Sequence, residues 1–173
     1  MSVTLLSECK THLGITSTTH DARLQRVLNS AERIAADIVG PLSPIPVTKR
    51  AFGGTDTLVL TELPVESVTS ITDASGSAVT ATYSIEGEYG ILTRTDGSTW
   101  PAVCVVTYNQ GFTTVPEDIE LAVFELARHL WQPARGPFAS GNDAQATVAL
   151  GGYVVPRAVA EIFERYPLAL GFA

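Results

Sequence analysis

The sequence predicts an α+β fold, in which a small bundle of about four helices carries an inserted antiparallel β module. Apolar residues recur at helical spacing near both ends of the chain, whereas short β-rich runs separated by turn residues fill the middle. Prolines at 41, 44 and 46 separate the first helical part from that middle. We therefore expect a helical domain of residues 1–46 plus 109–173 and a β module of residues 47–108.

Two helices are expected before the prolines. The first runs from about Leu5 to Gly14, a residue suited to ending a helix. The second follows Asp21, which is suited to the N-cap, and ends at Gly40 and Pro41. Its apolar face is continuous and comprises Leu24, Val27, Leu28, Ala31, Ile34, Ala35 and Ile38.

Five or six strands are expected between Val47 and Tyr108. Turn residues separate the runs, and the Asp96-Gly97 pair is the strongest hairpin signal among them. The expected strands are "VTKRAF", "DTLVLTE", "VESVTSIT", "TATYSIE", "GILTRT" and "AVCVVTY".

Helical periodicity returns at Pro116, a favourable first residue of a helix, and an acidic first turn follows it. A loop rich in Gly, Pro and Ala is expected over residues 132–152. A last helix begins at Pro156, and its buried side is expected to consist of Val159, Ile162, Phe163 and Tyr166.

Composition excludes several classes of protein. The chain has 173 residues, 18 acidic and 11 basic side chains and a net charge of −7, and its longest basic run is the pair Lys49 and Arg50. Proteins that grip the nucleic-acid backbone need clustered cations, so that class is not expected. Cys9 and Cys104 lie far apart without a metal-binding motif, and no signal peptide or membrane span is recognised. We expect a soluble protein made in a reducing cytoplasm.

Catalytic and metal-binding patterns are not recognised either. His12, His20 and His129 each lack a second ligand one helical turn away, and the paired glycines do not have the spacing of a phosphate-binding loop. Glu86 and Glu88 have the setting of solvated turn residues. We therefore expect no catalytic residue, no metal and no cofactor.

Aromatic residues in the β module leave an alternative open. Tyr83, Tyr89, Trp100 and Tyr108 could form a platform for a ligand, although aromatics at strand ends more often pack in a core. The alternative function is thus a monomeric ligand-binding module whose β insert recognises carbohydrate or peptide.

The helix after Pro116 carries more apolar surface than one core requires. Ile119, Val123, Leu126 and Leu130 form one stripe, and Leu121, Phe124 and Trp131 form a second stripe more than a quarter-turn away. The C-terminal tail also carries more apolar residues than expected, because Leu168, Leu170 and Phe172 follow Pro167 without a polar partner. Either such residues fold back onto their own domain or they dock on another surface.

Four segments, in this order, carry a resemblance to a known family. They are "LLSECKTHLGI" with "DARLQRVLNSAERI", then "LVLTELPVESVTSITDASG", then "WPAVCVVTYNQGFTTVPEDIELAVFELARHLW", and finally "GGYVVPRAVAEIFERY". The chain resembles the head-to-tail connector proteins, or adaptors, of long-tailed phages, especially those from phages of actinobacteria. It departs from them after Tyr166, where the basic residues associated with relatives are missing.

The resemblance implies a structural virion protein without catalytic activity. Such adaptors form a ring, usually twelvefold, beneath the portal protein and present a platform to a tail-proximal neck or stopper protein. DNA passes through the channel without specific binding, and no membrane is involved. The expected location is the head-tail neck of a virion, after synthesis in the host cytoplasm.

The resemblance also implies roles for named residues. Those expected at the subunit interface are Leu121, Phe124, Arg128 and Trp131, with Arg128 reaching an acidic group of the adjacent copy. Those expected to dock on the portal are Tyr166, Pro167, Leu168, Leu170 and Phe172. The β module is expected at the periphery of the ring.

Overall fold

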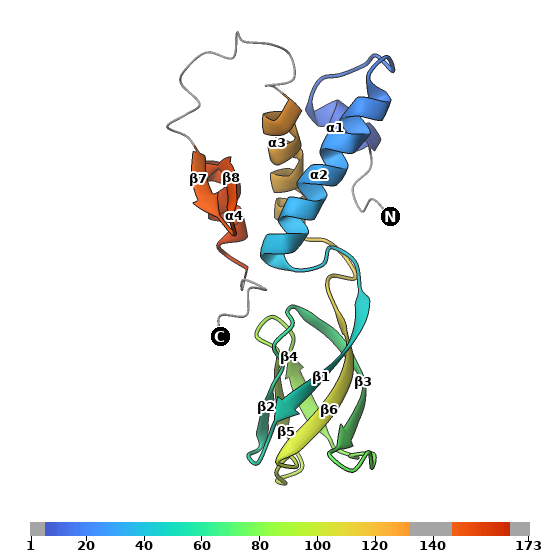
Figure 1. Cartoon of the computed structure of the whole chain (residues 1–173), viewed down its shortest axis with the longest axis vertical. Coiled ribbons are helices and arrows are strands. Elements are labelled where there is room, and N and C mark those ends of the chain that lie inside the picture. Colours follow the sequence, from blue (N-terminus) through green and yellow to red (C-terminus); the bar gives the residue numbers. More distant parts are fainter. Residues whose placement is uncertain (1–5, 132–146, 167–173) are drawn as a thin grey trace. The chain divides into compact units, whose positions relative to one another are not determined.

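The computed structural model describes residues 6–131 and 147–166, which divide into two compact units (Figure 1). The helical unit comprises the described residues up to Ile38 together with Val115–Tyr166, and the β unit comprises Val39–Thr114. The expected α+β class, with an antiparallel β module, is confirmed.

The unit boundaries differ from the domain boundaries expected from the sequence. Residues 39–46 and 109–114 belong to the β unit. The reason is their hydrogen bonding: the Gly111 amide donates to the Pro64 carbonyl at 2.9 Å, and the Phe112 amide donates to the Pro41 carbonyl at 3.3 Å. These bonds hold the segments flanking the module onto the sheet.

The first two helices of the helical unit are α1 (Leu6–His12) and α2 (Asp21–Val39). Helix α1 ends as expected near Gly14, which has a φ of 65°. The start of α2 differs from expectation by one residue. The His20 carbonyl accepts the first helical hydrogen bonds, and the Asp21 carboxylate instead lies 2.7 Å from Lys10 Nζ. Asp21 therefore joins α2 to α1 rather than capping α2.

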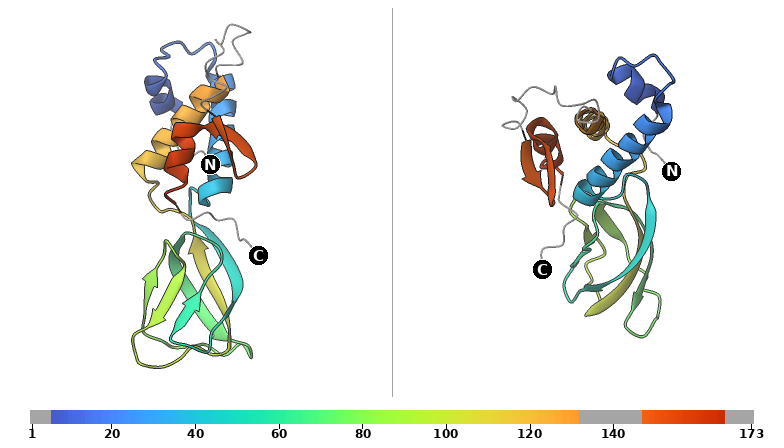
Figure 2. Two further views of the ribbon diagram at one scale, coloured as in Figure 1. Left: turned by 90° about the vertical axis from the view of Figure 1, so that its left-hand side faces the viewer. Right: turned by 45° about the horizontal axis from the view of Figure 1, so that its top comes forward.

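The other two helices are α3 (Glu117–Trp131) and α4 (Arg157–Phe163), which pack against each other (Figure 2). The core of this unit is apolar, as the 3.6-residue periodicity of α2 and α3 predicts. Its buried members include Leu24, Leu28, Ala31, Ala35, Ile38, Ile119, Ala122, Val123, Leu126, Ala127, Val159, Ala160 and Phe163.

A short hairpin precedes α4, where the sequence indicated a loop. Strands β7 (Thr147–Leu150) and β8 (Tyr153–Pro156) pair antiparallel. Gly151 and Gly152, at φ of 57° and 83°, form the two-residue turn between them. Each strand has only four residues, which is too short for a reliable alternation pattern. The glycine pair thus serves as a turn, as expected.

The β unit contains six strands in two antiparallel sheets (Figure 1). One sheet has the order β1 (Ile45–Phe52), β6 (Val103–Gln110) and β3 (Val65–Asp73). The other has the order β2 (Thr57–Val59), β5 (Ile91–Arg94) and β4 (Tyr83–Glu86). Both sheets supply the core, which comprises Ala51, Leu58, Leu60, Val65, Ile71, Leu92, Trp100, Cys104, Val106 and Tyr108.

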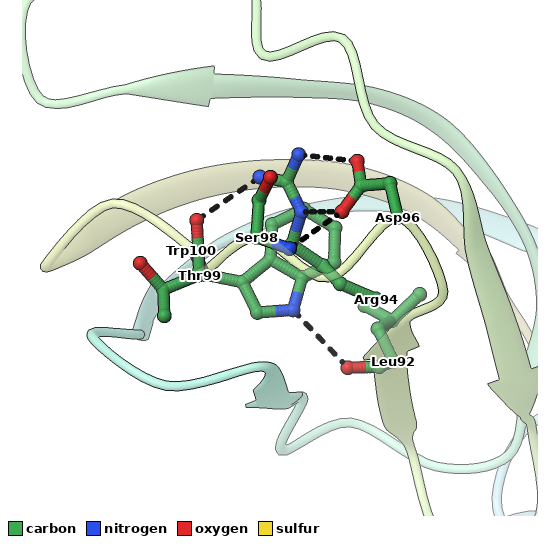
Figure 3. Close-up of polar contacts among 6 residues, drawn as sticks. All are labelled: Leu92, Arg94, Asp96, Ser98, Thr99 and Trp100. Carbon is green, nitrogen blue, oxygen red and sulfur yellow. Dashed lines mark hydrogen bonds and ion pairs between the residues drawn. The ribbon is translucent and has the colours of Figure 1, made fainter.

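The Asp96-Gly97 turn does not form the hairpin that its sequence indicated. Strands β5 and β6 on either side of it belong to different sheets, so the chain crosses between sheets here. Arg94 holds this crossing by donating to both Asp96 carboxylate oxygens, at 2.9 and 2.6 Å, and to the Thr99 carbonyl (Figure 3). The same guanidinium lies over the buried Trp100 ring, whose Nε1 donates to the Leu92 carbonyl. The hydrogen bonds that Asp96 accepts from the Arg94 side chain and then from the Ser98 amide lower the pKa of Asp96.

Candidate subunit interface

The chain itself covers most of the second apolar stripe of α3. Phe124 is 7% exposed and Trp131 is 6% exposed. The His12 ring of α1 lies 5.7 Å from the Phe124 ring, and the Arg23 guanidinium carbon of α2 lies 5.4 Å from the centre of the Trp131 ring. Phe124 and Trp131, both expected at an intersubunit contact, therefore pack in their own subunit.

Leu121 and Arg128 are the expected interface residues that remain accessible. Leu121 is 46% exposed, and the Arg128 side chain is 54% exposed. Arg128 Nη2 lies 2.6 Å from Glu125 Oε2, and Glu125 Oε1 lies 2.9 Å from His12 Nε2. The acidic partner of Arg128 in this chain is thus Glu125, one turn away on the same helix. An exposed pair of this kind contributes little to stability.

A groove between α1 and α3 surrounds Leu121. Its volume is about 390 Å³, and its lining is acidic around an apolar floor of Leu121 and Phe124. We call it the acidic groove; its other lining residues are Glu8, Thr11, His12, Glu117 and Glu120. Burial raises the pKa of Glu120, and the nearby Glu8 and Glu117 carboxylates raise it further. A cationic neighbour would relieve this repulsion.

A second groove, of about 340 Å³, lies between α2 and α3. We call it the basic groove; its lining residues are Arg23, Arg26, Val27, Ser30 and Leu130. Both charged residues in this lining are arginines. Arg26 is exposed and donates from Nε to the Ala22 carbonyl at 3.3 Å.

Sequence reasoning missed these two grooves because it followed apolar stripes alone. A charge signal was available, since Glu117 lies one helical turn before Leu121 and Glu120 lies directly before it. Arg23 and Arg26 stand in the same relation to Val27. Charged pairs beside a partly exposed apolar residue indicate the edge of a contact surface.

Only the first of the expected portal-docking residues falls within the described structure. Tyr166 follows α4, and its hydroxyl donates to Oδ1 of Asp118, which lies at the start of α3, at 2.5 Å. Pro167, Leu168, Leu170 and Phe172 lie outside the described residues.

The aromatic residues of the β unit do not form a shared platform. Trp100 and Tyr108 are buried in the core, and Tyr83 packs against the Trp100 ring at 5.7 Å. Tyr89 is exposed in the turn before β5. Three of the four thus have a packing role, which removes the observation behind the carbohydrate alternative.

Reactive groups in the described part of the chain are scattered. Within residues 6–131 and 147–166, no cluster of three or more His, Cys, Asp or Glu residues is placed to hold a metal ion. In those same ranges, no helix has the length and apolar character needed to cross a membrane. Cys9 and Cys104 are free and buried, and burial raises the pKa of the Cys9 thiol to about 11.

Comparisons with known proteins place the fold in a family. A family model described as "Head completion protein" matches residues 2–167. The chain belongs to the head completion protein family. Among solved structures, it is similar to a chain in the "Neck of empty GTA particle computed with C6 symmetry", where GTA denotes a gene transfer agent. The identity is 19%, the match covers 94% of this chain and 88% of that chain, and the TM-score is 0.61, which shows a shared fold. No curated protein matches the chain.

Family membership confirms the resemblance found in the sequence. This head completion protein is a structural head-to-tail adaptor of a virion. The comparisons do not favour the alternative of a monomeric ligand-binding module.

Proposed function

We propose that this head completion protein forms a closed ring, with twelvefold symmetry, that seats on a portal protein. The ring lengthens the DNA channel and presents its other face to a tail-proximal neck or stopper protein. Membership of the head completion family supports a place in the neck, and the shared fold with a chain from a particle neck computed with C6 symmetry supports a cyclic assembly. The number of twelve subunits comes from the family resemblance of the sequence. The protein acts by binding its neighbours and carries out no reaction.

The exposure of Leu121 is the observation that supports the proposal most directly. It is 46% exposed on α3, where the neighbouring apolar residues Ala122, Val123 and Phe124 are buried. A leucine half exposed to water gains further stabilisation when a second surface covers it. In a ring, the same contact repeats by rotation, so each copy covers Leu121 of its neighbour.

The charge of the chain suits a channel through which DNA slides. The net charge is −7, and basic residues are not clustered in the sequence. A channel wall of net negative charge repels phosphate groups, so DNA passes without specific binding. This fits a protein that is made in the host cytoplasm and then built into the neck of the virion.

The C-terminal tail is the proposed portal-binding segment. Tyr166 fixes the residue from which this tail starts, because the Tyr166 hydroxyl is hydrogen-bonded to Asp118 in the helical unit. Leu168, Leu170 and Phe172 supply apolar side chains for a portal surface.

Light scattering coupled to size-exclusion chromatography tests the ring, with the chain measured alone and after mixing with purified portal rings. We expect a ring in at least the second sample, and electron microscopy of it gives the symmetry. A chain that stays monomeric and unbound in both samples contradicts the proposal.

Removal of residues 167–173 tests the portal contact. We expect the shortened chain to lose portal binding while its circular dichroism spectrum stays unchanged. A control that keeps the length, with Leu168, Leu170 and Phe172 all replaced by serine, is expected to lose binding equally, because the apolar side chains make the contact. Normal binding of both variants would place the portal contact elsewhere on the chain.

A further inference from the structure

The acidic and basic grooves lie on opposite sides of α3. Leu121 lines the acidic groove and Leu130 lines the basic groove. They are nine residues apart, which at 3.6 residues per turn is about two and a half turns, so their side chains leave the helix in opposite directions.

The two grooves are complementary in charge and alike in their apolar content. Glu8, Glu117 and Glu120 line the acidic groove, whereas Arg23 and Arg26 line the basic groove. Each also exposes aliphatic surface, Leu121 in the first case and Val27 with Leu130 in the second. Their volumes, about 390 and 340 Å³, are similar in size.

We propose that the acidic groove of one copy packs against the basic groove of the next copy, and that this pairing is the repeating contact of the ring. The inference rests on the ring proposed above and names the surfaces that build it. Arg23 and Arg26 of one subunit then face the carboxylates around Leu121 of the other.

Charge decides between this contact and a two-fold contact. A two-fold axis brings a surface against its own copy, so two acidic grooves or two basic grooves would meet and repel each other. Pairing unlike grooves removes that repulsion and leaves one unused groove at each end of any open chain of subunits. Because the grooves lie on opposite sides of α3, such a chain continues from copy to copy, and it closes into a ring when the rotation between neighbours is a whole fraction of a full turn.

Two complementary variants test the pairing. The first carries Glu8→Lys and Glu117→Lys, which replaces two of the three carboxylates of the acidic groove with ammonium groups. The second carries Arg26→Glu and Ser30→Glu, which makes the basic groove acidic and leaves Arg23 over Trp131. All four positions are exposed, so both variants are expected to fold, as circular dichroism will verify.

Neither variant alone is expected to assemble, because like charges then face each other at every contact. The protein concentration needed for half assembly should rise at least about tenfold for each, measured by light scattering under the conditions in which the unmodified chain forms a ring. An equimolar mixture should assemble again, since each reversed groove meets its reversed counterpart and each native groove its native one. The rescued ring should contain equal numbers of the two variants, as alternation requires, and native mass spectrometry measures that composition.

A matched control places the same kind of change outside the grooves. Arg157→Glu with Glu161→Lys reverses an exposed pair on α4, and we expect assembly within about twofold of the unmodified chain. The inference is overturned if the groove variants assemble alone like the unmodified chain, or if their mixture fails to assemble. It is also overturned if the charge reversals change the unfolding midpoint of the monomer and leave ring assembly unchanged, because a segment of the same chain would then occupy the groove. Failure of the unmodified chain to form any ring would instead refute the proposed function.

Discussion

Separate alanine variants of Phe124 and Leu121 distinguish the core of the subunit from its contact surface. Both residues line the acidic groove, but Phe124 is 7% exposed and Leu121 is 46% exposed. We expect Phe124→Ala to destabilise the isolated subunit and Leu121→Ala to weaken assembly.

The magnitudes follow from burial. Phe→Ala at a buried site costs about 3–5 kcal/mol, and the lower end applies here because Phe124 lines a groove at the edge of the core. For Leu121, full burial contributes about 1.5–3 kcal/mol, so covering the 46% that is exposed contributes about 0.7–1.4 kcal/mol per contact. That free energy corresponds to an increase of about three- to tenfold in the concentration needed for assembly.

Urea unfolding followed by circular dichroism, at concentrations where the chain is monomeric, measures the first effect. Light scattering across a dilution series measures the second. Leu121→Ala should change the free energy of unfolding by no more than about 1 kcal/mol, since a partly exposed leucine contributes little and alanine favours the helix. The reasoning is refuted if Phe124→Ala unfolds like the unmodified chain, or if Leu121→Ala assembles at an unchanged concentration.

Three further predictions concern the stability of each unit. Trp100→Ala should lower the free energy of unfolding of the β unit by about 3–5 kcal/mol, measured by urea unfolding, because the side chain is buried in its core. Asp96→Asn should lower the thermal midpoint at neutral pH, since the Asp96 carboxylate accepts two hydrogen bonds from Arg94. The pKa of Asp96 is lowered from its ordinary 3.8, so the difference in thermal midpoint between the variant and the unmodified chain should shrink as the pH falls below 3.8. A difference that stays constant with pH would contradict this. In a Cys104→Ser background, Cys9 should resist alkylation in the folded chain and react in denaturant, because burial raises its thiol pKa from 9.0 to about 11. The neutral Cys9 thiol stabilises the fold below pH 9.0, and this contribution to the free energy of unfolding should be lost as the pH rises toward 11.

Much of the fold could be predicted because its elements have clear periods. Helix α2 repeats apolar residues on one face over 19 residues, and β6 alternates between buried and partly exposed positions along its whole length. The errors fell where local signals compete with long-range pairing. Asp96-Gly97 is a turn, yet the sheet to which each flanking strand belongs depends on distant partners that a local pattern does not contain.

The candidate site was harder to predict for a similar reason. Periodicity separates two faces of α3, but it does not reveal that α1 and the start of α2 cover Phe124 and Trp131. A short helix such as α1, with seven residues, has too few apolar positions for its packing partner to be recognised. The exposure of Leu121 and the charges around it can therefore be recognised only in the three-dimensional structure.

The pairing of β1 with β6 has a consequence for how this chain could diverge. Ile45, which opens β1, lies opposite Gln110, which closes β6, so the first strand of the β unit starts beside the point where its last strand ends, with the two Cα atoms about 4.5–5.5 Å apart. A segment with adjacent ends is an exchangeable cassette, since a shorter or longer version can be spliced in without rerouting the rest of the polypeptide. Natural variation and engineering can thus reshape residues 45–110 independently, while the surfaces on α1, α2 and α3 keep their sequence.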